Sequence, residues 1–229
     1  MGSCMNRLFL ILAAVAAVLL TPEISLANQE ACASAVAQVE RSAGVPPRLM
    51  QAIALAESGR WDPDKRASFA WPWTVNAEGQ GRFLPTKEAA IAEVQRLKAR
   101  GVRSIDVGCM QINLMHHPDA FDSLEDAFDP VKNATYASEF LRDLYTARKS
   151  WPEAVAHYHS ATPELHEPYR KRVYALWNGP EVKTPEVQTV AASAVPGTMS
   201  SRAFLPRGGT NNWVVMRGRI LQVNSVARR

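Results

Sequence analysis

The strongest constraint on this chain is a succession of segments in which apolar residues recur at the spacing of one helix face. Their ends carry residues that start or stop helices: Thr86 and Asp129 are good N-caps, while Gly44 and Gly101 follow apolar stripes. Segments of this kind cover 30–43, 46–58, 86–101 and 129–145, start again at 150, and close with 169–177. The sequence therefore predicts a mainly α domain.

One region departs from helical spacing. Residues 71–84 hold β-forming side chains on both sides of the turn-forming run 76–79, which predicts a small hairpin or an extended flap. Residues 102–107 are typical of a short strand that ends at Gly108. The predicted fold is thus mainly α with a small β element.

The N-terminus has the pattern of an export signal. Arg7, the apolar run 8–20 and the small residues of 25–27 predict that residues 1–27 are removed and that the mature protein is periplasmic. An uncleaved membrane anchor stays open as an alternative, although 13 apolar residues fall short of the roughly 20 that span a bilayer. The predicted domain is 28–180.

Positive charge gathers at the C-terminus. The chain has a net charge of +4; residues 187–229 hold six Arg and no acidic residue, whereas 28–186 hold 19 basic and 21 acidic residues. A near-neutral domain argues against nucleic acid as the ligand, because a nucleic-acid-binding domain itself holds the basic patch. We expect 181–229 to be a basic, disordered tail in which only 212–226 could order, as a docking segment for a protein partner or an anionic surface.

Two cysteines remain once the predicted signal, which contains Cys4, is removed. In an oxidising compartment the even pair Cys32 and Cys109 favours a disulfide, with two buried free thiols as the alternative. Closing this loop would stabilise the fold by up to about 4.5 kcal/mol in the chain-entropy model.

Glu57 stands at an unusual place for a carboxylate. It shares one helical stripe with Leu49 and Ile53 and falls in the last turn before Ser58 and Gly59 end the helix. The partial negative charge at a helix C-terminus disfavours ionisation there by about 0.3 to 1 kcal/mol, and burial acts in the same direction. Both effects favour a protonated Glu57, as an acid catalyst requires.

Three ordered segments connect this glutamate to a known family. They are 54–59 (ALAESG), 107–113 (VGCMQIN), and 154–160 (AVAHYHS) followed by 169–173 (YRKRV). Their order and spacing resemble the soluble-lytic-transglycosylase (SLT) domain, a mostly helical, lysozyme-like fold, over roughly 32–177. The region 71–84 then corresponds to an insertion, which we expect to border the cleft.

The resemblance implies a role for each matching residue. Glu57 matches the catalytic glutamate of the family's Glu-Ser pair, and the substrate-binding residues are expected to be Ser58, Met110, Gln111, Asn113, Tyr158 and Tyr169. Where the family often has Ala-Tyr-Asn-x-Gly, this chain has HYHSA at 157–161. Trp71 and Trp73, with Trp61, are candidates for stacking on sugars, and core packing is the equal alternative.

The family's reaction needs one carboxylate and no metal or organic cofactor. A protonated glutamate donates to the glycosidic oxygen, and the same carboxylate then accepts the proton of the sugar's own C6 hydroxyl as that hydroxyl attacks C1. The implied substrate is the peptidoglycan glycan strand, cleaved between N-acetylmuramic acid and N-acetylglucosamine by a monomer that leaves 1,6-anhydromuramyl ends. Relatives with appended tails open the wall locally for a flagellum or secretion apparatus, which suggests a protein partner for the tail.

Two other functions stay open. The first is a hydrolytic muramidase, in which Asp62, Asp64, Glu78 or Asp106 activates water opposite Glu57. The second is a peptidoglycan-binding assembly factor without catalysis. Zinc binding by the histidine pairs is disfavoured, because neither pair has a zinc-enzyme spacing; we expect surface or capping roles for His116, His117, His157 and His159.

The charge and composition boundary generates a first prediction. A variant that ends at residue 180 should fold on its own and melt cooperatively, because 181–229 contributes no predicted core. Thermal unfolding followed by circular dichroism checks this result, and loss of cooperative melting would overturn the boundary.

Overall fold

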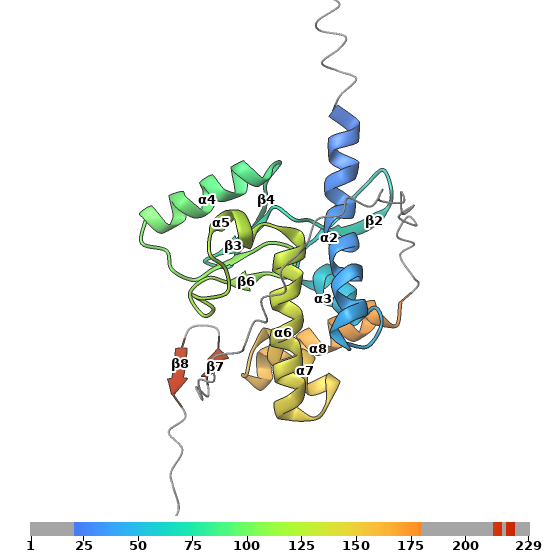
Figure 1. The fold of residues 1–229 in the computed structure, drawn as a ribbon, viewed down its shortest axis with the longest axis vertical. Helices are drawn as coiled ribbons and strands as arrows, with labels where there is room; N and C mark the ends of the chain where they lie inside the picture. The colour runs from blue at the N-terminus through green and yellow to red at the C-terminus, as the bar shows by residue number, and fades with distance from the viewer. Residues whose placement is uncertain (1–20, 180–212, 217–218, 223–229) are drawn as a thin grey trace, which may run out of the picture.

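The computed structural model describes the backbone of residues 21–179, 213–216 and 219–222 and the side chains of residues 28–179. Within these residues, a group of helices packs beside a small antiparallel sheet that a further helix covers (Figure 1). The prediction of a mainly α domain with a β-hairpin is confirmed.

The helical part is built from long amphipathic segments that pack in pairs. Helix α2 packs against α6, α3 against α8, and α7 against both α6 and α8. Their bounds are α2 Thr21–Ala43, α3 Leu49–Ser58, α6 Pro130–Arg148, α7 Trp151–His159 and α8 Pro163–Trp177. The shared core is apolar and tightly closed, with Leu49, Met50 and Ile53 of α3 fully buried.

The predicted helix starts are used as caps. Thr86 Oγ1 accepts from the backbone N–H of Ala89 at 3.2 Å, and Asp129 accepts from the N–H groups of Val131 and Lys132. The Ser150 hydroxyl accepts from the Glu153 N–H at 3.5 Å. These bonds satisfy backbone donors that a helix leaves unpaired, which is why the boundaries were readable from the sequence.

The β part forms two sheets within residues 59–113. One is the pair of β1 (Gly59–Asp62) with β2 (Ala67–Ala70). The other has the order β4-β3-β5-β6 and is antiparallel throughout; its strands are Thr74–Ala77 (β3), Gln80–Phe83 (β4), Ile105–Val107 (β5) and Ile112–Asn113 (β6). The predicted hairpin is β3 and β4, and the predicted strand over 102–107 is β5.

A second apolar core supports this sheet. Helix α4 (Lys87–Ala99) buries Ala90, Val94 and Leu97 against the strands, and Phe128 closes the layer beside the short helix α5 (Leu124–Ala127). The insertion is therefore a packed unit with its own core, which gives the strands a rigid base.

The N-terminal helix is longer than its predicted span of 30–43, because α2 begins at Thr21. It crosses the predicted cleavage point after residue 27, and the apolar run 8–20 lies outside the described residues. None of the helices in the described part of the chain combines the length and apolar character that crossing a bilayer requires.

The C-terminal segment holds one hairpin of β7 (Trp213–Met216) and β8 (Arg219–Gln222). It falls inside 212–226, the only stretch of the tail that the sequence suggested could order. The remainder of the tail lies outside the described residues, so its predicted disorder stays a prediction.

Cys32 and Cys109 form the predicted disulfide, with Cα atoms 5.6 Å apart and 77 residues between them in sequence. Cys32 belongs to α2, and Cys109 lies in the turn between β5 and β6. The bond therefore ties the helical part to the sheet at a fully buried point.

We predict that the double variant Cys32→Ala/Cys109→Ala is less stable than the wild type by about 2 to 4 kcal/mol, because the unfolded chain regains loop entropy. Denaturant unfolding with and without a reductant measures the difference. The reductant should destabilise the wild type and leave the double variant unchanged; equal stability of the reduced and oxidised wild type would contradict the prediction.

Candidate active site

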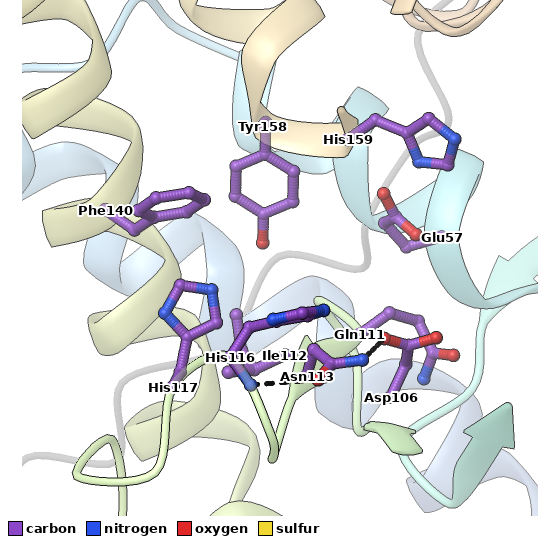
Figure 2. Close-up of a pocket in the computed structure, with 10 residues that line it drawn as sticks. All are labelled: Glu57, Asp106, Gln111, Ile112, Asn113, His116, His117, Phe140, Tyr158 and His159. Atoms are coloured by element: carbon purple, nitrogen blue, oxygen red, sulfur yellow. Dashed lines mark hydrogen bonds between the residues drawn. The ribbon is translucent and has the colours of Figure 1, made fainter. Parts of the chain in front are cut away.

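One cavity lies where the two parts of the domain meet (Figure 2). Side chains from α3, α6 and α7 enter it from the helical part, and side chains from β5, β6 and the following loop enter it from the sheet. The lining residues are Glu57, Asp106, Gln111, Ile112, Asn113, His116, His117, Phe140, Tyr158 and His159.

Glu57 reaches the cavity because α3 ends directly after it. At Gly59 the chain turns out of the helix, and a Cβ there would lie 2.3 Å from the Leu55 carbonyl oxygen, so this exit requires glycine. The half-buried Glu57 side chain then points from the last helical turn toward the sheet (Figure 2). The sequence prediction of a helix-end glutamate facing a cleft matches this placement.

Two tyrosines lie close enough to Glu57 to respond to its charge. Burial and the Glu57 carboxylate raise the pKa of Tyr158 well above its ordinary value, and the same two causes act on the pKa of Tyr169. Both side chains therefore keep their hydroxyl proton at neutral pH. Tyr169 presents a hydrogen-bond donor beside the glutamate, whereas the Tyr158 hydroxyl donates its proton elsewhere.

Tyr158 and Tyr169 are held differently. The Tyr158 hydroxyl donates to the Met110 carbonyl oxygen at 2.9 Å, and its ring packs against Phe140. Tyr169 is 7% exposed and stacks on His159 with ring centroids 4.5 Å apart. Tyr169 lies behind the cavity wall, against Glu57, so the structure assigns it contact with the carboxylate and not a place in the lining.

The turn 108–111 carries Gln111 into the cavity under unusual backbone constraints. Gly108 has φ +81°, and Gln111 has φ +49°, in the left-handed region that most residues avoid. The side chain of Asn133, fully buried on α6, holds this turn: its Oδ1 accepts from the Met110 N–H at 2.9 Å, and its Nδ2 donates to the Val107 and Ala127 carbonyls.

The Gln111 side-chain amide is fixed by the same turn. Its Nε2 donates to the carbonyl oxygens of Thr74 at 3.1 Å and Gly108 at 3.0 Å. Gln111 is thus both a lining residue, as predicted, and a brace between the turn and β3. The two interpretations weighed from the sequence, substrate contact and hydrogen-bonded turn, are compatible.

Asn113 lines the cavity on β6 and is engaged through both ends of its amide. Its Nδ2 donates to Asp106 Oδ1 at 2.8 Å, and its Oδ1 accepts from the N–H groups of Met115 and His116. The structure therefore places Asn113 at the site mainly as the residue that orients Asp106 and the loop behind it.

Besides Tyr169, two predicted substrate-binding residues do not line the cavity. Ser58 is 1% exposed, and its hydroxyl donates to the Cys109 carbonyl at 2.7 Å. Met110 is fully buried in the helical core. Both residues instead connect the end of α3 to the turn that holds Gln111, and so support the site without lining it.

The three candidate stacking tryptophans differ in burial, and none of them lines the cavity: Trp61 is 60% exposed on β1, Trp73 is half-buried, and Trp71 is buried. Trp71 is 3% exposed, donates from Nε1 to the Leu84 carbonyl at 2.7 Å, and has the Arg60 guanidinium over its ring. Trp73 packs against the sheet core. The suggestion that Trp71 stacks on sugar is wrong, since no face of its ring is open; the alternative, core packing, is confirmed.

The expectation of surface or capping histidines is also wrong for three of the four. His116, His117 and His159 line the cavity. Burial lowers the pKa of His117 to about 4, with a smaller effect from His116, and burial lowers the pKa of His116 against the opposing charge of Asp106. The imidazoles of His116 and His117 are therefore neutral at neutral pH and can both donate and accept hydrogen bonds.

These histidines could not be assigned from spacing alone. Nδ1 of His117 lies 2.8 Å from the Tyr136 hydroxyl, and its ring meets Phe140 edge-on, so it belongs to an aromatic wall supplied by α6. The one available signal was His159, which stands in the family motif beside Tyr158. In the described part of the chain, no group of three or more His, Cys, Asp or Glu side chains is arranged to hold a metal ion.

A helix-end glutamate beside two protonated tyrosines, at the junction of a helical core and a small sheet, defines a glycan-cleaving site of the lysozyme-like type. The model of the family Transglycosylase SLT domain matches residues 34–173. The chain belongs to this family of lytic transglycosylases, enzymes that act on peptidoglycan. Comparisons with curated proteins and with solved structures found no match.

The turn 108–111 generates a prediction with a matched control. An alanine Cβ at Gly108 would lie 2.5 Å from Asn133 Nδ2, whereas Gly101 has the similar φ of +82° and nothing within 4 Å of its added Cβ. We expect Gly101→Ala to cost about 1 to 2 kcal/mol from backbone strain alone. Gly108→Ala should cost about 1 to 3 kcal/mol more, from the clash.

Denaturant unfolding measures both values, and activity on peptidoglycan should fall in Gly108→Ala alone among the folded variants. Equal losses of stability in the two variants would show that the Asn133 contact does not constrain the turn.

Proposed function

We propose that this protein cleaves the bond between N-acetylmuramic acid and N-acetylglucosamine in peptidoglycan and leaves 1,6-anhydromuramyl ends. The observation that carries the proposal is Glu57, aimed from the end of α3 into a cavity and flanked by Tyr158 and Tyr169. Membership of the family supplies the reaction class.

The proposed reaction uses Glu57 twice. Its proton passes to the glycosidic oxygen as the C1–O bond breaks, and the resulting carboxylate takes the proton of the C6 hydroxyl while that oxygen bonds to C1. The glutamate is regenerated and no water is consumed. Neutral hydroxyl and imidazole groups around the cavity suit the binding of a sugar, because they donate to and accept from its hydroxyl and acetamido groups.

Tyr169 supports the second half of this cycle. Once Glu57 has lost its proton, a hydroxyl donor stabilises the carboxylate that forms, and the buried Tyr169 hydroxyl lies beside Glu57 with no other group in the described residues to accept its proton. The Tyr169 hydroxyl can thus stay beside Glu57 both when the glutamate is protonated and when it is ionised.

A hydrolytic muramidase remains a second candidate because one carboxylate faces Glu57 across the cavity. Of the four acidic residues that the sequence suggested for this role, Asp106 lines the cavity. Asp62 accepts from Gln29 and from backbone groups of its own turn, and Glu78 pairs with Arg100 at 3.9 Å at the tip of the hairpin. Asp64 is exposed and lies outside the cavity lining, so the hydrolytic alternative depends on Asp106.

We also propose a periplasmic location and a protein partner for the tail. The export pattern of residues 1–27 supports the first, and the six-arginine, acid-free segment 187–229 supports the second. Local wall opening for a flagellum or secretion apparatus is the cellular role that such an arrangement fits.

The proposed reaction is tested by mass spectrometry of the muropeptides that the mature protein releases from purified peptidoglycan. The wild type should release anhydro products, and Glu57→Gln should lower their rate of release by about 10²-fold to 10⁴-fold, because glutamine cannot transfer the proton. If Glu57→Gln unfolds at the same temperature as the wild type, the loss of activity is due to the missing proton donor and not to misfolding.

Each other outcome points to a named alternative. Reducing-end products that disappear in Glu57→Gln would make the protein a hydrolase. Release of nothing by a folded wild type, on free glycan strands as well as intact wall, would favour the binding and assembly role.

A further inference from the structure

The wall of the cavity opposite Glu57 holds a carboxylate in a prepared position. Asp106 is the central residue of β5, and its register partners are Asn76 on β3 and Asn113 on β6. Each asparagine donates from Nδ2 to a different carboxylate oxygen, Asn113 at 2.8 Å and Asn76 at 3.2 Å. A carboxylate accepting at both oxygens fits the ionised, acceptor-only form.

The Asp106 carboxylate has a fixed position because Asp106, Asn76 and Asn113 each lie on a strand of the same sheet. Asp106 cannot turn away without losing both amide donors, and the sheet that carries it rests on the core under α4. Figure 2 shows Asp106 below and Glu57 above the same space, so the carboxylate faces the point at which the glutamate delivers its proton. In the lytic reaction Glu57 alone gives and regains the proton, so Asp106 has no role in it as an acid or a base.

We propose that Asp106 is a second catalytic residue, an ionised carboxylate that stabilises the positive charge developing at C1 and the ring oxygen while the glycosidic bond breaks. The inference rests on the proposed lytic reaction and deepens it. Asp106 takes up no proton and forms no bond: Glu57 gives and regains the proton, the C6 oxygen attacks C1, and Asp106 acts through its charge alone.

The physical reason is the loose, cation-like transition state of glycoside cleavage. A fixed negative charge facing that cation acts without reorganising, and it acts more strongly where aromatic side chains exclude water. Phe140, Tyr158 and His117 supply such a wall here. The other titratable groups that face the space are His116 and His159, which are not acidic.

The test compares Asp106→Asn with Glu78→Gln on soluble, uncrosslinked glycan strands. Both changes neutralise one carboxylate of the same sheet, and Glu78 lies at the exposed hairpin tip outside the cavity. We expect kcat to fall by about 10²-fold to 10³-fold in Asp106→Asn with little change in KM, while the products remain anhydro. Glu78→Gln should keep the wild-type kcat.

A second variant protects the test against misfolding. In Asp106→Asn/Asn113→Asp the two partners are exchanged, so the new Asn can accept from Asn76 and donate to the new Asp, which still accepts from the N–H groups of Met115 and His116. We expect wild-type unfolding and a kcat that stays at least about tenfold low, because the charge has moved one strand along the wall.

The pH dependence adds a readout that a structural role would not change. Removing a negative charge opposite Glu57 makes loss of the glutamate's proton easier, so the alkaline limb of the kcat/KM profile should move to lower pH in Asp106→Asn. It should not move in Glu78→Gln.

The possible failures are distinguishable. Wild-type kcat in a folded Asp106→Asn overturns the role of Asp106 and leaves the lytic reaction intact. Reducing-end products from the wild type that vanish in Asp106→Asn would show that Asp106 activates water, and would overturn both this inference and the proposed reaction.

Discussion

The buried amide of Asn133 organises the site more than any residue inside the cavity. It satisfies the Met110 N–H and the Val107 and Ala127 carbonyls from one position on α6. Unpaired, these backbone groups would each cost about 1 to 3 kcal/mol in the core. The amide fills the space that a Cβ at position 108 would need, and Gly108 has φ +81°, so both the packing and the backbone require glycine in the turn that carries Gln111 into the cavity.

The two catalytic carboxylate candidates belong to different cores, and their separation depends on how those cores are joined. Glu57 moves with α3 in the helical core, whereas Asp106 moves with β5 in the sheet. The Cys32–Cys109 disulfide and the Ser58–Cys109 hydrogen bond cross this boundary next to the cavity. Interactions that look purely structural therefore set the geometry on which the chemistry depends.

The sequence predicted local features well and long-range ones poorly, for physical reasons. Helix caps, the hairpin turn and the position of Glu57 depend on neighbouring residues, so Thr86, Asp129 and Ser150 could be assigned directly. The environment of a side chain depends on residues distant in sequence. Trp71 is buried by the distant Leu84 and Arg60, and His117 meets Tyr136 and Phe140 on another helix, so periodicity alone could not distinguish core from surface at these positions.

The packing around residues 157–161 shows one consequence of their departure from the family motif. His159 stands where the family often has asparagine, and its ring lies flat on Tyr169, 4.5 Å away between centroids. An asparagine side chain offers no comparable ring surface, so this chain holds Tyr169 against Glu57 by stacking. Burial and then the charge of Glu57 are the two largest causes that raise the pKa of Tyr169, which places the hydroxyl next to this carboxylate. His159 therefore helps to fix the position of the Tyr169 ring, and through it the hydroxyl beside Glu57.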